Sequence, residues 1–208
     1  MDRMYRWTRH VYDATRRYYL LGRDRMLRDI AERPPGAVLE VGCGTARNLR
    51  CLHRRAPGHT LCGLDASTEM LATARQSLAR AGLTGRVMLA QGLAGDLDPH
   101  RHFGRDAPFD VVFFAYVLSM IPAWPAAFDA AWTHLRPGGH LYVVDFWDHD
   151  DLPGWFASLM RGWLALFGVH HRPALLDYLR RLEETDRARL TLTSVARRYA
   201  YIARLEKR

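Results

Sequence analysis

The segment Val38-Leu39-Glu40-Val41-Gly42-Cys43-Gly44-Thr45 decides the fold of this chain. Its first half is apolar except for Glu40, which predicts a buried strand over 37–41. Gly42 and Gly44 then let the backbone turn and approach a ligand closely, and a helical pattern resumes at Thr45. A strand, a glycine turn and a helix in this order predict the first unit of a parallel α/β sheet with a ligand at the helix N-terminus.

The same alternation of short apolar runs and longer helical patterns continues to Asp145. It predicts five parallel strands, at 37–41, 59–64, 86–90, 109–114 and 140–145, the last of them after the turn Arg136-Pro137-Gly138-Gly139. The clearest helices are predicted at 45–55, 67–81 with Ser67 as N-cap, and 125–135. Two alternating stretches near the end, 190–195 and 199–205, predict a closing antiparallel pair.

Two stretches lie outside this unit. Residues 1–33 predict an N-terminal helical cap that is broken near Gly22. Residues 146–185 predict an aromatic-rich helical insertion between the fifth and sixth strands, ending in a leucine-rich helix. A length of 208 residues leaves room for one domain with such additions, so we expect a single domain over 1–208.

The composition, with 49% hydrophobic and 25% charged residues, is that of a globular protein and excludes disorder, collagen and coiled coil. The net charge of +8 is concentrated at the ends: residues 1–33 carry +4 and 180–208 carry +5, against −1 for the residues between. Basic ends favour an anionic partner, either nucleic acid or an acidic membrane face. The same net charge would also result if the arginines only lie on solvent-exposed helix faces and bind no partner.

The three cysteines are odd in number and the first residues lack an apolar signal-peptide core, which favours the cytoplasm. No apolar run approaches the roughly 20 residues of a transmembrane helix. The nearest is 155–169, where 11 of 15 residues are apolar. We therefore expect a cytoplasmic protein that lies at the inner face of the membrane without spanning it.

An acid, Asp65, stands 23 residues past Gly42 and directly after the second predicted strand, where its carboxylate can accept both ribose hydroxyls of an adenosine group. A dinucleotide site would have a third glycine at position 47, and this chain has Arg47. Glu40 would repel a pyrophosphate but suits a cofactor charged through an ammonium, a sulfonium and a carboxylate. These residues predict S-adenosylmethionine as cofactor, S-adenosylhomocysteine as product, and no metal ion.

The ordered motifs resemble the seven-stranded S-adenosylmethionine-dependent methyltransferases, whose fold is a Rossmann-like α/β sheet with helices on both faces. The resemblance rests on Val38–Thr45, on Gly63-Leu64-Asp65-Ala66-Ser67 with Met70-Leu71, on Phe109-Asp110-Val111-Val112 and on Leu135-Arg136-Pro137-Gly138-Gly139. The family usually has a third glycine where Ala46 stands, which is a mild departure.

A narrower resemblance lies outside these motifs. It rests on Arg9-His10-Val11-Tyr12-Asp13, Thr15–Arg25, Leu118-Ser119-Met120-Ile121-Pro122 and Val143-Val144-Asp145-Phe146, which are similar to the bacterial betaine-lipid N-methyltransferases. The resemblance implies trimethylation of a diacylglyceryl-homoserine lipid, with an aminolipid and an anionic membrane as partners. Where that family tends to have Gln-Gly-Asp-Ala, this chain has Gln91-Gly92-Leu93-Ala94.

Candidate site residues follow from these motifs. The expected cofactor contacts are Glu40, Gly42, Cys43, Gly44, Asn48, Asp65, Ala66, Met70, Gln91, Gly92, Leu93, Ala115 and Tyr116. The expected catalytic residues are Tyr116, Tyr19 and Tyr12, because an aromatic cage excludes water and attracts the cationic amine. The expected acceptor-binding residues are Tyr18, Ser119, Arg23 and Arg172, with the arginines as candidates for a headgroup carboxylate. His10 is a candidate proton acceptor.

Two other functions stay open at this point. The acceptor can be phosphatidylethanolamine or another amine, because arginine binds a phosphate as well as a carboxylate. A non-catalytic nucleic-acid-binding protein would also explain the positive charge. Against it, the chain lacks an appended helix-turn-helix or zinc module, so no nucleic acid is expected. The plain structural alternative for the tyrosines is packing in the core.

Overall fold

The computed structural model describes residues 20–148, 150–165 and 172–208. Their centre is a seven-stranded sheet with the order β3-β2-β1-β4-β5-β7-β6. The strands are β1 (Ala37–Val41), β2 (Thr60–Asp65), β3 (Val87–Gln91), β4 (Phe109–Ala115), β5 (Leu135–Phe146), β6 (Ala188–Val195) and β7 (Ala200–Lys207). The first five run parallel, while β7 runs antiparallel to both β5 and β6. The expected α/β sheet with a closing antiparallel pair is confirmed.

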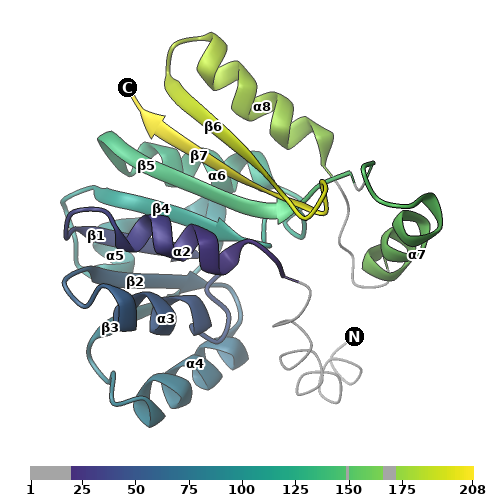
Figure 1. Ribbon diagram of the computed structural model, residues 1–208. Helices are drawn as coiled ribbons and strands as arrows, with labels where there is room; N and C mark the ends of the chain where they lie inside the picture. The colour runs from purple at the N-terminus through teal and green to yellow at the C-terminus, as the bar shows by residue number, and fades with distance from the viewer. Residues whose placement is uncertain (1–19, 149, 166–171) are drawn as a thin grey trace.

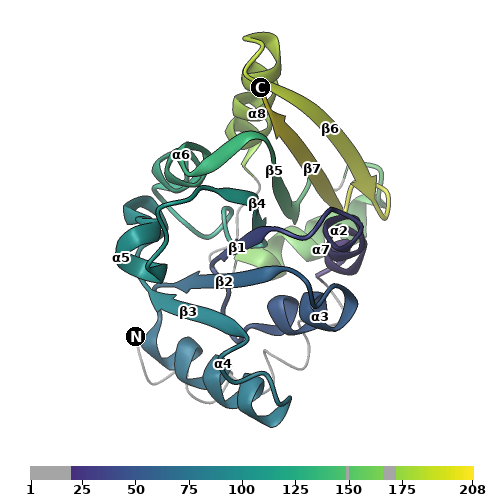
Figure 2. The same cartoon turned by 90° about the vertical axis from the view of Figure 1, so that its left-hand side faces the viewer.

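Helices cover both faces of the sheet because apolar side chains of the central strands point to both sides. One face is covered by α2 (Arg23–Ala31), α3 (Arg47–Arg55) and α4 (Thr68–Arg80), and the other by α5 (Pro99–Phe103), α6 (Trp124–Thr133) and α8 (Pro173–Glu184). Figure 2 shows the sheet between these two layers. Each layer closes a separate apolar core, and the buried Val111 and Val112 of β4 belong to opposite cores.

The strand order reverses between β1 and β4, because the chain adds β2 and β3 on one side of β1 and then returns to add β4 and β5 on the other. The loops after β1 and β4 leave the sheet at the same edge and diverge there. In a parallel sheet this point is a crevice suited to a ligand. The remaining described helix, α7 (Gly154–Ala165), lies beyond this same edge, apart from the sheet (Figure 1).

The observed elements differ from the predicted ones mainly at their ends. The turn at 136–139 proved to be a bulge inside a longer β5: Phe109 pairs with Leu135 and Val111 with His140, so the extra residues loop out. The helix predicted at 45–55, α3, begins at Arg47 instead of residue 45, because the glycine loop continues through Ala46. Ser67 caps α4 as predicted, accepting the Met70 amide at 3.2 Å. The 3₁₀ turn Ala94–Asp96 and α5 were not predicted.

The described parts of the two additions to the sheet contain the helices α2, α7 and α8. Gly22, at φ +85°, precedes α2, as the predicted break requires. In α8 the predicted leucine face is buried, through Leu175, Leu176, Leu179 and Leu182. Within the described parts of the chain, none of the helices combines the length and apolarity needed to cross a membrane.

Candidate functional site

Two neighbouring cavities open where β1, β2 and β4 end. The first, of about 440 Å³, lies between the glycine loop, α2 and the loop after β4, and the second, of about 540 Å³, lies between the ends of β2 and β3 and the loop that leads to α6. Gly42, Asp65 and Val117 line both cavities. One extended ligand can therefore occupy both, with its middle beside Asp65.

The glycine loop after β1 brings its backbone against the loop after β4. Gly42 has φ +74°, and a Cβ placed there would lie 2.4 Å from Cγ2 of Val117, so no larger residue fits. Gly44 has φ +52° with nothing within 4 Å of its Cβ position, which leaves space for a ligand. Ala46 also adopts a left-handed conformation, with φ 57°, which is the physical reason that glycine suits this position.

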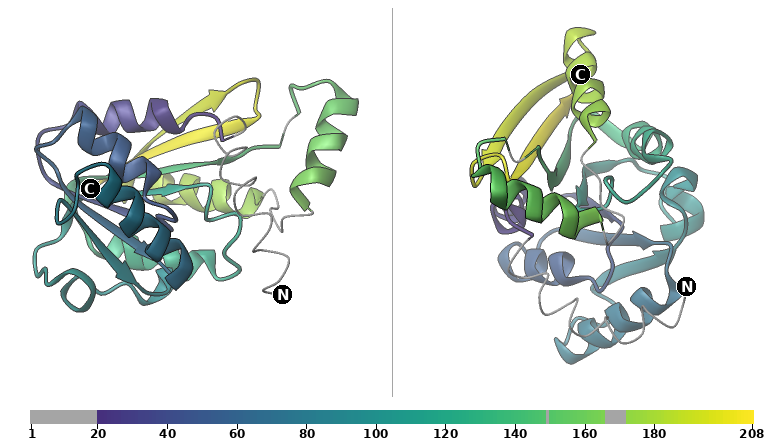
Figure 3. Two further views of the ribbon diagram at one scale, coloured as in Figure 1. Left: turned by 90° about the horizontal axis from the view of Figure 1, so that it is seen from below. Right: turned by 90° about the vertical axis from the view of Figure 1, so that its right-hand side faces the viewer.

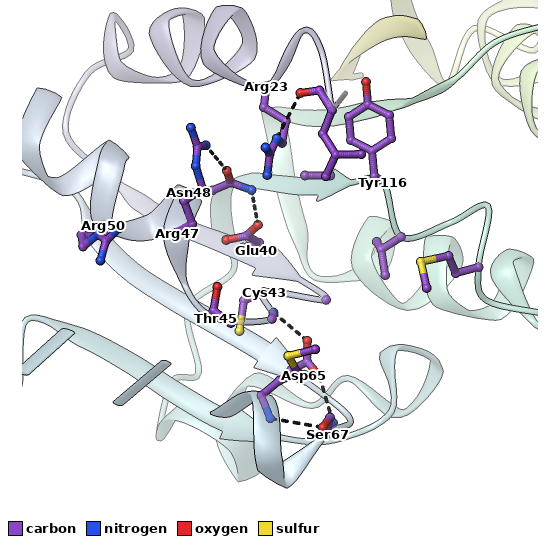
Figure 4. A pocket seen from close by; sticks show the side chains of 17 residues that line it. Arg23, Glu40, Cys43, Thr45, Arg47, Asn48, Arg50, Asp65, Ser67 and Tyr116 are labelled. Atoms are coloured by element: carbon purple, nitrogen blue, oxygen red, sulfur yellow. Dashed lines mark hydrogen bonds between the residues drawn. The ribbon is translucent and has the colours of Figure 1, made fainter. Parts of the chain in front are cut away.

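Asp65, at the end of β2, holds the loop in place. One carboxylate oxygen accepts the Gly44 amide at 2.7 Å, and the other accepts the Ser67 amide at 2.9 Å (Figure 4). A carboxylate has about four lone-pair positions, so two remain for hydroxyl donors on a ligand. This geometry is the one that a ribose diol requires.

Glu40 lies at the bottom of the first cavity and is 1% exposed. Its Oε1 accepts the side-chain amide of Asn48 at 2.7 Å, while Oε2 is buried with no hydrogen-bond partner among the described residues. Burial raises the pKa of this carboxyl to about 8, against the lowering effects of Asn48 and of Arg23. A buried carboxyl with an unpaired oxygen at a cavity wall is suited to a cationic ligand group.

Three arginines also line the first cavity, and each has a partner. Arg23, the first residue of α2, is 7% exposed and donates to the Leu20 carbonyl at 3.2 Å. Arg47 lies 3.6 Å from Asp24, and Arg50 donates to Ser77 at 2.6 Å. From the sequence, Arg23 is expected to contact a carboxylate of the acceptor. The structure puts Arg23 on the same cavity as Glu40 (Figure 4), where cationic groups also suit a carboxylate of the cofactor.

Tyr116 follows β4 and lines the first cavity. It is 3% exposed, has φ 58°, and its hydroxyl donates to the Leu21 carbonyl, so it connects the β4 loop to the segment before α2. Its ring packs edge-on against Phe146 at 4.6 Å between centroids. Burial raises the pKa of its hydroxyl well above the usual value, so Tyr116 stays neutral.

Ser119 and Arg172 lie behind the first cavity and are not among the described residues that line it. The Ser119 amide donates to the buried carboxylate of Asp145 at 2.9 Å, and Arg172 Nε donates to the Ser119 carbonyl at 3.2 Å. Burial raises the pKa of Asp145 to about 6. These contacts fix the loop that carries Tyr116, which is a positioning role.

The second cavity has the character of a site for a flat apolar ring. Of the predicted cofactor contacts, Ala66, Gly92 and Leu93 line it, together with Gly42 and Asp65, which line both cavities. Gln91 does not line it but lines a separate pocket with Gly92 and Leu93, and its side chain donates to the Ala66 carbonyl at 3.3 Å. Cys43, Gly44, Asn48, Met70 and Ala115 line the first cavity.

Some predicted residues lie outside the described part of the chain, and other lining residues were missed. Tyr12, Tyr18, Tyr19 and His10 fall in 1–19, where nothing is described. The lining residues that were not among the predicted site residues are Leu20, Val41, Thr45, Arg47, Arg50, Leu64, Ser67, Ala94, Gly95, Asp96, Val117, Met120, Ile121, Pro122, Ala123 and Ala126. Thr45, Arg47 and Val117 adjoin predicted residues, and that adjacency was a usable signal. The start of α6 offered none, because its contribution depends on how that helix packs.

The residues present fit an adenosyl cofactor with an amino acid tail. The unpaired Glu40 oxygen suits an ammonium, the free side of the Asp65 carboxylate suits a ribose diol, and the space above Gly44 admits the close approach of a ligand. The apolar second cavity suits a purine.

Comparison with known proteins agrees with this geometry. Residues 38–139, about half of the chain, match the family model of a methyltransferase domain. This segment belongs to that family, and its cofactor is S-adenosylmethionine.

Two curated relatives illustrate the range of acceptors. The chain is 34% identical over 121 residues to a trans-aconitate 2-methyltransferase of Deinococcus radiodurans, covering 58% of this chain and 42% of that protein. It is 32% identical over 118 residues to a phosphatidylethanolamine N-methyltransferase of Cereibacter sphaeroides, covering 57% and 54%. The chain thus matches about half the length of these relatives.

The fold is also similar to that of solved methyltransferase structures. The structure of the S-adenosylmethionine-dependent methyltransferase SibL in its apo form superposes with a TM-score of 0.72 at 24% identity, covering 95% of this chain and 57% of that one. The seven-stranded fold of the methyltransferases is thereby confirmed.

Replacing Asp65 tests the centre of the site. We expect Asp65→Ala to raise the dissociation constant for S-adenosylhomocysteine at least ~100-fold, because two charge-assisted hydrogen bonds to the ribose and the loop contacts are lost. Asp65→Asn keeps one oxygen acceptor and should cost about tenfold. Isothermal titration calorimetry measures both, with the exposed Asp106→Ala as control and circular dichroism to check folding. Unchanged affinity in both Asp65 variants would contradict this role.

Glu40 should release its proton when the cofactor binds. An ammonium beside Oε2 lowers the carboxyl pKa from about 8, so binding at pH 6.5 should release about one proton and tighten as the pH rises toward 8. Calorimetry in two buffers of different ionisation enthalpy counts the protons. Glu40→Gln should release none. A wild-type protein that releases no proton would show that Glu40 does not meet the ammonium.

Proposed function

We propose that this protein transfers a methyl group from S-adenosylmethionine to the amino group of a lipid. The observation that carries this proposal is a set of exposed apolar side chains at the edge where the cofactor site opens. Met120, 37% exposed, lines the first cavity, and Trp155 and Leu159, 73% and 65% exposed, lie one turn apart on α7 beyond the same edge (Figure 3). An acceptor with acyl chains would bury such side chains.

The side chains around the first cavity favour an amine over a hydroxyl as acceptor. An alcohol must lose its proton as it is methylated, whereas a neutral amine reacts through its own lone pair. Among the described residues that line the cavity there is no histidine or lysine. The Tyr116 hydroxyl is used on the Leu21 carbonyl, and burial raises the pKa of the Cys43 thiol, so neither is a ready base.

The cofactor, when bound, supplies a methyl group on a sulfonium. Glu40 would bind and orient its ammonium and Asp65 would bind its ribose, in the cavity that the loop after β4 also lines. The contacts of Tyr116 and of the Asp145 carboxylate hold that loop in place, so the acceptor amine would bind against a fixed surface. Alignment of two reactants can supply several kcal/mol of the acceleration. The positive charges of Arg23, Arg47 and Arg50 on this cavity would favour the neutral amine by lowering its pKa.

The resemblance in the sequence makes diacylglyceryl-homoserine the first candidate acceptor. Arg23, Arg47 and Arg50 give the first cavity positive charge for the headgroup carboxylate of this acceptor as well as for the carboxylate of the cofactor. Phosphatidylethanolamine is the second candidate, favoured by the relative that methylates it. Both acceptors carry a primary amine and two acyl chains.

A panel of acceptors tests the proposal. The full chain would be incubated with methyl-labelled cofactor and mixed micelles of each lipid, or with bulk tRNA, and the lipids separated by chromatography. We expect label on diacylglyceryl-homoserine, and none with Asp65→Ala. Label only on phosphatidylethanolamine would replace the first acceptor with the second. Label only on tRNA, or on neither lipid, would contradict an aminolipid methyltransferase.

We also propose that the protein reaches its acceptor at a membrane surface, through the Trp155 and Leu159 face of α7 and the basic ends of the chain. Co-sedimentation should show more binding to vesicles with phosphatidylglycerol than to neutral vesicles. Replacing both Trp155 and Leu159 with serine should lower partitioning at least ~10-fold, because the burial of two large apolar side chains is lost. Ser158→Ala is the control. Equal binding to both vesicle types, or to neither, would contradict membrane contact.

A further inference from the structure

The orientation of the cofactor along the two cavities follows from the charged groups. Glu40 lines only the first of the two cavities, while Asp65 lines both. With the ammonium at Glu40 and the ribose at Asp65, the purine must continue into the second cavity. That cavity is therefore where this chain recognises the base of its cofactor.

Few polar side chains are available there to read the base. Apart from Asp65 and Asp96, every described residue that lines the second cavity has an apolar side chain or none. Asp65 is committed to the loop amides and the ribose. Asp96 is exposed on the 3₁₀ turn Ala94–Asp96, and its backbone carbonyl accepts Arg101 at 2.7 Å.

Leu93 lines the second cavity and follows the strand that pairs with β2. In the register of β2 and β3, Asp65 pairs with Gln91, so Leu93 follows only two residues past the strand end opposite Asp65. It lines the cavity and is 63% exposed, so its side chain is accessible to a ligand there. A ligand ring in the cavity would cover this side chain.

We propose that this chain recognises the cofactor's purine by its shape and apolar surface, with Leu93 against the ring, and does not read the 6-amino group. This inference rests on the assigned cofactor and on its proposed orientation. A carboxylate at position 93 would accept from a 6-amino group and repel a 6-oxo group, whereas leucine does neither. Cofactors altered at C6 of the purine should therefore bind nearly as well as the natural one.

Binding of three products to the full chain tests this directly. S-adenosylhomocysteine, S-inosylhomocysteine, which has a 6-oxo group, and N6-methyl-S-adenosylhomocysteine would be titrated by calorimetry. We expect their dissociation constants to agree within tenfold in the wild-type protein.

Substitution at position 93 should create the missing selectivity. In Leu93→Asp the preference for the 6-amino over the 6-oxo compound should rise at least tenfold, while Leu93→Asn, whose amide can donate or accept, should add little. Because Leu93 is largely exposed, both variants should keep the fold.

A wild-type preference of more than tenfold for the 6-amino compound would overturn the proposal. If Asp96→Asn then removed that preference, Asp96 would be the residue that reads the base. An Asp variant at position 93 without new selectivity would also overturn it. Failure of S-adenosylhomocysteine itself to bind would reject the cofactor orientation as well, whereas binding without lipid methylation would reject only the proposed acceptor.

Discussion

The carboxylate of Asp65 is the contact on which the site depends. It accepts one amide from the glycine loop after β1 and one from the start of α4, so it ties together the loops that follow two adjacent strands. It also stands between the two cavities. Because a carboxylate that accepts two amides keeps lone pairs for further donors, this one side chain at the β1–β4 switch point can both shape the loop and present an acceptor for the cofactor.

The charges around Asp65 divide the crevice into unlike parts. On one side, Glu40 is buried with an unpaired oxygen among three arginines, a setting for the zwitterionic tail of the cofactor. On the other side, Leu93 and its neighbours form an apolar wall for the base. The positive charge of the chain therefore belongs in part to the cofactor site, and only the remainder is available to an anionic surface.

The fold and the cofactor residues were largely predictable because they depend on local patterns. Apolar runs marked the first five strands and alternating patterns the last two, while glycine, Glu40 and Asp65 stood at fixed distances from strand ends. The bulge in β5 was not predictable as such, since it depends on pairing with β4. Nor were Ile121 and Ala126 predictable as lining residues, or the positioning role of Arg172, because these follow from how distant segments pack.

The most direct test of this account is a crystal structure of the protein with S-adenosylhomocysteine. The account predicts the ribose hydroxyls on Asp65, the ammonium on the unpaired oxygen of Glu40 and the purine against Leu93. A ribose bound away from Asp65, or a purine in the cavity beside Glu40, would contradict it.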